Sequence, residues 1–304
     1  SVDTPTSHCL KLAFLVKKDQ IPITVENIIA AHKKRRREIR ARLAEFAAIG
    51  RKGSDLNLFE EMVFCFFTGG CSAKMGLSSI EAIKPILLTA DQPELANALV
   101  GHHRYPNARS KYVVASRDFL QQEYGLKLRK KLRSFDCHFE RRDWLVREKG
   151  IKGLGYKEAS HYLRNIGYKG YAILDKHVLN CLTELKIIDD PKPPNTRAKY
   201  LMVEEKLKQQ AKKEAKMLAE INSVISVLRD GMLKIGAKTG TSGKIFGSVT
   251  SVQIARAIRE QKGYEIDRRR ITILDEVKEL GTFKAKVDFG NGNETELEFE
   301  VVAD

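Results

Sequence analysis

The sequence predicts a multidomain protein in which an all-α domain is followed by a helical spacer and a small α+β domain. The chain of 304 residues is longer than most single domains, so two domains are expected. Apolar residues recur at helical spacing through the first 200 residues, whereas the last part of the chain alternates apolar and polar residues as strands do. We place the domains at residues 1–205 and 230–304, with the spacer at residues 206–229.

Helices of the first domain are predicted from apolar residues at helical spacing, interrupted by Gly, Asp and Pro. The first helix is expected over residues 25–47, where Ile28, Ile39 and Phe46 share one face. It contains a run of cations at residues 33–37, which either contacts nucleic-acid phosphate or forms a solvated face. Further helices are expected over residues 56–68, 78–88, 92–101, 108–124 and 138–149.

The spacer is predicted from a change in composition. From residue 200 to residue 228 the sequence is dominated by Lys, Glu, Gln and Ala, which favour helix. Glu204 precedes Lys208 by four residues, the spacing of an ion pair on an exposed helix. We therefore expect an exposed helix that makes few contacts with either domain.

The C-terminal domain is predicted to combine a short helix with a terminal β-hairpin. Thr250 and Gln253 have the spacing of a capping box, which would begin a helix over residues 251–260. Apolar residues then alternate over residues 283–289 and again over residues 297–301, and a Gly- and Asn-rich stretch separates the two runs. Two strands joined by a tight turn follow from this pattern.

The net charge of +15 is concentrated in the first two thirds of the chain. Residues 1–200 contain 36 Lys and Arg against 22 Asp and Glu, whereas residues 241–304 contain 10 against 12. A basic surplus favours a polyanionic partner, because neutralised phosphates release counterions. A solubilising surface is the alternative explanation.

The cysteines and the apolar runs exclude several classes of protein. Five cysteines without a Cys-x-x-Cys pair argue against a disulfide framework and a zinc knuckle. No apolar run has the length of a membrane span, and the first residues lack a signal-peptide pattern. We expect a cytoplasmic protein with reduced thiols, without a metal centre and without a membrane partner.

The chemistry-bearing residues are concentrated in residues 151–179, IKGLGYKEASHYLRNIGYKGYAILDKHVL. Gly153, Leu154 and Gly155 are expected to form a tight hairpin that exposes backbone N–H groups at a helix N-terminus, a position that suits phosphate. Glycines also serve any sharp turn between helices, so this motif alone is weak. Lys157 begins the following helix, and its amine is a candidate Schiff-base nucleophile.

Asp175 is the candidate partner of Lys157. The helix that starts at Lys157 is expected to be about 15 Å long, and an extended connection over residues 168–174 can span that length. Asp175 would cap the next helix and return to the neighbourhood of Lys157, where a carboxylate can stabilise positive charge on a departing sugar. Taken singly, however, Lys157 can be a surface lysine and Asp175 only a cap.

Together these residues resemble the helix-hairpin-helix DNA glycosylases that also cleave the strand. The segments GLGYKEASHYLRNIG and AILDKHVL are most similar to the corresponding segments of the archaeal-style type-two 8-oxoguanine DNA glycosylases. The similarity continues through residues 64–76 and 105–114. The resemblance implies an enzyme, a DNA glycosylase with abasic-site lyase activity, that excises 8-oxoguanine from double-stranded DNA. In that family a lysine Schiff base forms and β-elimination cleaves the strand, with the target base flipped out of the duplex.

The resemblance also implies roles for individual residues. Lys157 carries over as the nucleophile and Asp175 as its acidic partner. Contacts with DNA are implied for Gly153, Leu154, Gly155, Lys152 and Arg109. The pocket for the flipped base is implied for Phe66, Thr68 and Ser72, although an aromatic residue there also suits a core. No cofactor is expected, because only Cys181 follows the hairpin and the iron-sulfur cluster of some relatives needs more cysteines.

Residues 243–258, GKIFGSVTSVQIARAI, resemble the C-terminal domain of the ninth protein of the bacterial large ribosomal subunit. The spacer resembles the central helix of that protein, whose N-terminal domain has no counterpart in this sequence. The resemblance implies ribosomal RNA as a candidate partner, through the matching residues Lys244, Phe246, Ser248 and Thr250. The slight acidic surplus of residues 241–304 leaves open how strongly this domain binds RNA by itself.

Two other functions remain open, a non-catalytic sensor of DNA structure and a ribosome-associated RNA-binding protein. The combination of Lys157 with Asp175 argues against the first, and the missing N-terminal ribosomal domain weakens the second. We expect a monomer. The resemblance further implies that family members end near residues 200–210 with a lysine that helps enclose the flipped base. Since this chain continues, we expect cleavage at a pre-formed abasic site to survive better than excision of 8-oxoguanine.

Overall fold

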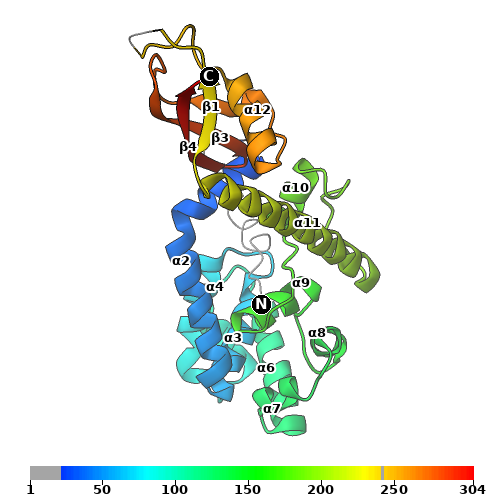
Figure 1. Ribbon diagram of the computed structural model, residues 1–304. Helices are drawn as coiled ribbons and strands as arrows, with labels where there is room; N and C mark the ends of the chain where they lie inside the picture. The colour runs from blue at the N-terminus through cyan, green and yellow to red at the C-terminus, as the bar shows by residue number, and fades with distance from the viewer. Residues whose placement is uncertain (1–21, 241–242) are drawn as a thin grey trace. The chain divides into compact units, whose positions relative to one another are not determined.

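The computed structural model describes residues 22–240 and 243–304, which form two compact units (Figure 1). The helical unit contains residues 32–207. The sheet unit contains the described part of residues 208–304 together with residues 22–31. The division falls inside two long helices, α2 (Val25–Lys52), between residues 31 and 32, and α11 (Arg197–Arg229), between residues 207 and 208.

The all-α prediction for the first domain is confirmed for the residues that the structure describes. The helices, as shown in Figure 1, are α2 (Val25–Lys52), α3 (Asp55–Thr68), α4 (Ala73–Ile83), α5 (Gln92–Ala98), α6 (Pro106–Tyr124), α7 (Leu128–Arg133), α8 (His138–Arg147), α9 (Tyr156–Asn165) and α10 (Lys176–Glu184). The helix expected over residues 78–88 is instead α4 and a separate 3-10 turn, Lys84–Ile86, because Pro85 cannot donate a backbone hydrogen bond to an α-helix. The six-residue α7 was not predicted from the sequence.

Helix α3 forms the centre of the helical unit. Its residues from Met62 to Phe67 are buried on every side, which explains why apolar residues follow one another there without helical spacing. Ser54 begins α3 with a capping box, in which its hydroxyl accepts from the backbone N–H of Asn57 at 3.1 Å. Helix α9 contributes Ala159, Tyr162 and Leu163 to the same core, so the helix that carries Lys157 is anchored on one side by packing.

The sheet unit confirms the predicted α+β fold and adds two strands. Its elements are β1 (Leu233–Ala237), α12 (Ser251–Lys262), β2 (Ile271–Ile273), β3 (Gly281–Gly290) and β4 (Asn293–Ala303), and the strand order is β1-β4-β3-β2. The expected hairpin is β3 and β4, joined by Asn291 and Gly292, which both have positive φ as a tight hairpin turn requires. The unpredicted β1 pairs in parallel with β4.

Helix α11 differs from the exposed spacer expected from its composition. Near its start Val203, Glu204 and Leu207 are buried, and near its end Leu228 belongs to the core of the sheet unit. The middle of the helix is open to solvent on every side, since all side chains from residue 216 to residue 220 are exposed. The prediction that Glu204 lies on an exposed face is therefore wrong: its side chain is 4% exposed.

Two absences apply to the described part of the chain. No helix among these residues has the length and apolarity needed to cross a membrane. Within residues 22–240 and 243–304, no group of three or more His, Cys, Asp or Glu side chains is arranged to hold a metal ion.

Candidate active site

The hairpin before α9 depends on its two glycines. Gly153 has a φ of +80°, and a Cβ atom there would lie 2.6 Å from the ring of Tyr112, so both backbone conformation and space require glycine. Leu154 is buried and anchors the hairpin in the core. Gly155 is the N-cap of α9 and has no side chain to occupy the first N–H groups of the helix. These backbone donors are consequently left available to an anion.

Lys157 lies in the first turn of α9, directly after the hairpin. Its Nζ atom is 2.8 Å from Oε1 of Glu158, and the side chains of Lys157 and Glu158 are 31% and 17% exposed. Glu158 was not identified from the sequence, where only its place beside Lys157 could have indicated a role. The half-buried ion pair gives the amine a defined position while leaving it accessible.

His161 follows Lys157 by one helical turn, so the two side chains share a face of α9. Its ring packs edge-on against Phe64, with ring centroids 5.8 Å apart. Burial, and to a smaller extent the positive charge of Lys157, lowers the pKa of His161 to about 4. The imidazole is therefore neutral at pH 7 and adds no second positive charge beside the amine.

Asp175 is the N-cap of α10, as the sequence predicts, and its Oδ1 atom accepts from the backbone N–H of Val178 at 2.8 Å. Burial lowers the pKa of Arg164 to about 10, and the negative charge of Asp175 opposes that shift. The electrostatic effect of Asp175 on α9 is thus seen at Arg164, about two turns after Lys157. Among the described residues, the ion-pair partner of Lys157 is Glu158.

The two cations expected to contact DNA occupy different environments. The side chain of Lys152 is exposed, while its backbone N–H donates to the hydroxyl of Ser116 at 2.9 Å. Arg109, on α6, donates from Nη2 to the carbonyl oxygen of Gly69 at 2.5 Å. Its guanidinium lies over the rings of Tyr105 and Tyr112. Arg109 therefore holds the start of the α3–α4 turn in addition to any contact with DNA.

The three residues expected to line a base pocket lie in or after α3. Phe66 is 1% exposed and belongs to the core around that helix. The half-buried Thr68 donates its hydroxyl to the carbonyl oxygen of Cys65 at 3.0 Å. Ser72 is exposed and caps α4 by accepting from the backbone N–H of Met75 at 3.2 Å. The structure gives each of them a packing or capping contact of its own.

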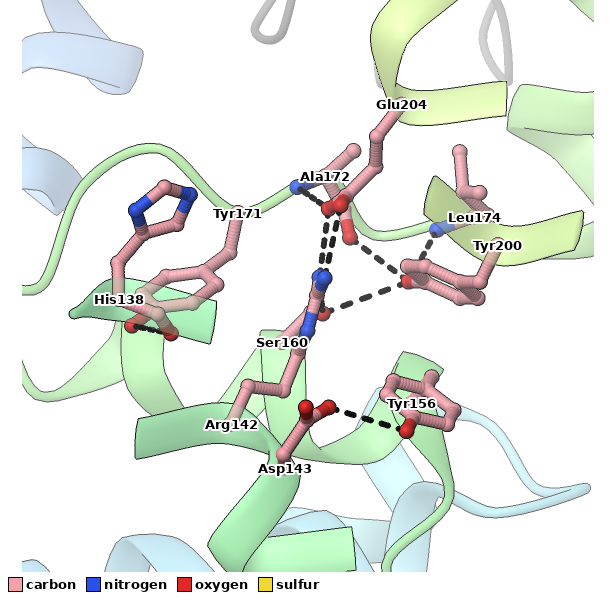
Figure 2. A network of polar contacts seen from close by, with 10 residues as sticks. All are labelled: His138, Arg142, Asp143, Tyr156, Ser160, Tyr171, Ala172, Leu174, Tyr200 and Glu204. Atoms are coloured by element: carbon pink, nitrogen blue, oxygen red, sulfur yellow. Dashed lines mark hydrogen bonds and ion pairs between the residues drawn. The ribbon is translucent and has the colours of Figure 1, made fainter. Parts of the chain in front are cut away.

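Figure 2 shows a buried polar network beside α9, none of which was identified from the sequence. Its centre is an ion pair between Arg142 of α8 and Glu204 of α11, with Nη1–Oε1 and Nη2–Oε2 distances of 2.6 and 2.8 Å. The Nη1 atom of Arg142 also donates to Ser160 of α9 at 3.1 Å. The network further contains Tyr200, whose hydroxyl reaches the segment that leads to Asp175.

The residues expected to bind RNA follow β1 in the sheet unit. Lys244 and Ser248 are exposed, and the ring of Phe246 is 75% exposed. Thr250 begins α12, and its backbone N–H donates to Oε1 of Gln253 at 2.8 Å, which confirms the predicted start of that helix. An aromatic ring this exposed is available for stacking.

Comparison with known proteins gives two family matches. A profile described as 8-oxoguanine DNA glycosylase matches residues 39–216, and one described as ribosomal protein L9, C-terminal domain, matches residues 209–303. A relative from Korarchaeum cryptofilum, named 8-oxoguanine DNA glycosylase/AP lyase, is 37% identical over 194 residues, which are 64% of this chain and 88% of the relative.

Solved structures give the same result. The crystal structure of the Methanocaldococcus jannaschii 8-oxoguanine DNA glycosylase is 34% identical with a TM-score of 0.53, covering 64% of this chain and 84% of that chain. The same organism's 8-oxoguanine glycosylase/lyase in complex with a 15mer DNA containing 8-oxoguanine is 31% identical with a TM-score of 0.54, covering 67% and 88%. The Thermotoga maritima 8-oxoguanine DNA glycosylase is 32% identical with a TM-score of 0.56, covering 62% and 89%.

Proposed function

The chain belongs to the 8-oxoguanine DNA glycosylase family, and on that premise we propose that it excises 8-oxoguanine from double-stranded DNA and cleaves the strand at the abasic site. The observation that carries the proposal is the place of Lys157. It is an accessible amine in the first turn of α9, directly after a glycine hairpin that puts no side-chain cap on the N-terminus of that helix. A non-catalytic sensor of DNA structure would have no need of this amine.

In the proposed reaction the hairpin binds a DNA phosphate and the damaged nucleotide is flipped out of the stack. The ammonium of Lys157 first passes a proton to the carboxylate of Glu158. Its neutral amine then attacks C1′ of the sugar as the bond from C1′ to the base breaks, and the base leaves with the bonding electrons and takes a proton from Nζ. The sugar ring then opens to give an imine between Nζ and C1′. Loss of a proton from C2′ expels the 3′ phosphate and cleaves the strand.

Two acidic residues support this reaction in different ways. The carboxylate of Asp175, which interacts electrostatically with Arg164 two turns after Lys157, is assigned the role of stabilising the positive charge that develops on the sugar. Glu158 holds the Lys157 side chain before DNA binds. His161, one turn after Lys157, is uncharged at pH 7, so it places no positive charge next to the amine.

Borohydride trapping on duplex DNA that contains 8-oxoguanine tests the proposal. The full-length protein should become covalently attached, and Lys157→Gln should abolish attachment while duplex affinity stays within about threefold, since the hairpin contacts are mainly backbone and electrostatic. Lys213→Gln, on an exposed part of α11, is the matched control and should trap normally. Trapping by the Lys157 variant, or none by the wild type, would contradict the proposal.

We further propose that the sheet unit binds structured RNA, for which ribosomal RNA is the candidate. The observations that favour it are the match to the ribosomal protein L9 domain and the exposed ring of Phe246 beside Lys244. Stacking on such a ring contributes about 1–3 kcal/mol per base. Phe246→Ala in the full chain should weaken binding of ribosomal RNA fragments without affecting duplex DNA, and equal RNA affinity would contradict this role.

We also propose that the protein acts as a monomer in the cytoplasm. The proposal is supported by its DNA substrate and by relatives from archaea and bacteria, whose DNA lies in that compartment. Sedimentation of the full chain with and without duplex DNA tests the first part, because a dimer would double the sedimenting mass. Cell fractionation tests the second.

A further inference from the structure

We propose that the first two turns of α11 position the catalytic groups, with Arg197, Tyr200 and Glu204 as positioning residues for Lys157 and Asp175. The inference rests on the function proposed above and assigns a catalytic consequence to a helix that its composition marks as a spacer. The three residues are spaced by three and four positions, so they lie on one face of the helix. Tyr200 and Glu204 contact the loop that ends at Asp175, and Arg197 acts through Asp143 on the residue before Lys157.

Glu204 connects three segments of the helical unit (Figure 2). Its carboxylate pairs with Arg142 of α8 through two hydrogen bonds of 2.6 and 2.8 Å. Oε1 also accepts from the backbone N–H of Ala172 at 2.9 Å, in the loop between α9 and α10. Because Arg142 also donates to Ser160 on α9, this buried pair joins the helix of Lys157 to the loop that ends at Asp175.

Tyr200 holds the same loop closer to Asp175. Its hydroxyl donates to the carbonyl oxygen of Ala172 at 2.7 Å and accepts from the backbone N–H of Leu174 at 3.3 Å. The hydroxyl also lies 3.4 Å from the Oγ atom of Ser160. Burial raises the pKa of Tyr200 to about 12, so the phenol keeps its donor proton at neutral pH. The residue immediately before Asp175 is thereby tied to α11.

Arg197 holds the other end of the site. Its Nε atom donates to Oδ2 of Asp143 at 2.7 Å, and Oδ1 of Asp143 accepts from the hydroxyl of Tyr156 at 3.0 Å. Tyr156 immediately precedes Lys157, and its ring lies 5.5 Å from the ring of Tyr200. The residue before the nucleophile is therefore fixed through the same face of α11.

These contacts determine the position of Asp175 relative to Lys157, because the two residues lie on different helices. The loop between those helices has no regular structure and contains Gly167 and Gly170, which both adopt positive φ. The loop alone therefore cannot hold Asp175 at a set place relative to α9. Displacement of a catalytic group by about 1 Å can cost about 100-fold in rate. Tyr171 anchors the middle of the loop by donating to the carbonyl oxygen of His138 at 2.8 Å, and the contacts from α11 add the restraint nearest to Asp175, at Ala172 and Leu174.

Tyr200→Phe tests the inference, since it removes one oxygen and keeps the packing. We expect the single-turnover rate of 8-oxoguanine excision to fall about 10- to 100-fold, with duplex affinity unchanged within about threefold because the hairpin is intact. Tyr124→Phe, on α6, is the matched control and should react at the wild-type rate. Arg197→Gln provides a second test at a half-exposed side chain, which is 38% exposed, and should slow the reaction in the same way.

The decisive readout is the combination of Tyr200→Phe with Asp175→Asn, measured at a temperature where circular dichroism shows every variant folded. If Tyr200 acts through Asp175, the double variant should be no slower than Asp175→Asn alone. Losses that multiply, or an unchanged rate in the folded Tyr200 variant, would overturn the inference while wild-type trapping keeps the proposed function intact. Failure of the wild type to trap would overturn the proposed function, and this inference with it.

Discussion

Replacement of Arg142 by Met should destabilise the helical unit by about 3–5 kcal/mol, because it leaves the charge of Glu204 buried without its cationic partner. The side chains of Arg142 and Glu204 are 1% and 4% exposed, so water cannot replace the lost hydrogen bonds. For a domain of this size 1 kcal/mol corresponds to about 2–4 °C in Tm, and the expected decrease is therefore roughly 6–20 °C. Thermal unfolding of the full chain, followed by circular dichroism, measures it.

Two further variants separate the missing partner from a general packing defect. The double variant Arg142→Met/Glu204→Met should recover most of the loss, since an apolar pair often replaces a buried ion pair at little cost. Arg35→Met, which removes an exposed ion pair with Glu38, should cost less than about 1 kcal/mol. The reasoning is refuted if Arg142→Met lowers the free energy of unfolding no more than Arg35→Met does. It is also refuted if the double variant loses as much as Arg142→Met and Glu204→Met lose in sum when measured singly.

Four other predictions concern the site. Asp175→Asn should slow base excision by orders of magnitude without unfolding, since the amide still caps α10 but carries no charge; an unchanged single-turnover rate would leave Asp175 as a cap only. Gly153→Ala should weaken duplex binding and lower Tm more than Gly125→Ala, because both have positive φ but only Gly153 would clash, with Tyr112; equal effects would argue against the clash. The pKa of His161 is lowered to about 4, so protons bind the unfolded chain before the folded one, and the free energy of unfolding should fall by about 3 kcal/mol as pH decreases from about 6.5 towards 4. Urea unfolding at several pH values measures this loss, and His161→Phe should not show it. Compared with the Methanocaldococcus jannaschii enzyme, this protein should lose less of the rate of cleavage at a pre-formed abasic site than of the rate of 8-oxoguanine excision. Both rates are measured for both proteins on duplexes of matched sequence. An excision rate equal to that of the archaeal enzyme would show that α11 completes the pocket.

The parts of the site that could be predicted from the sequence are those encoded by neighbouring residues. The hairpin at Gly153, the helix that starts beside Lys157 and the cap at Asp175 each follow from a few consecutive side chains. The ion pair of Arg142 with Glu204 could not be predicted, because 62 positions separate the partners and neither has a local signature. Glu204 even had the spacing of a surface ion pair, and only the packing of α11 determines that this face is buried.

The same distinction applies to the fold. The hairpin of β3 and β4 has a local turn and was predicted. Strand β1 pairs with β4 about 66 positions later, and its five residues are too few for an alternating pattern to identify it. The short helix α7 lacks both a cap bond and the length that periodicity needs. Phe66 illustrates the limit for the base pocket, since an aromatic residue in a buried helix has the same pattern whether it fills a core or adjoins a ligand.

The continuity of α11 also bears on how such a gene can be assembled and altered. The two family matches overlap at residues 209–216, within one unbroken helix whose exposed middle follows directly. Every residue inserted or deleted in that exposed stretch would turn the rest of the helix by about 100° and shift it by about 1.5 Å. The side-chain contact at stake among residues 216–220 is the exposed ion pair of Lys216 with Glu220, at 4.0 Å, and an exposed pair contributes less than about 1 kcal/mol. The exposed stretch of α11 is therefore a place where the length of the helix can change with little loss of side-chain packing inside the helix itself.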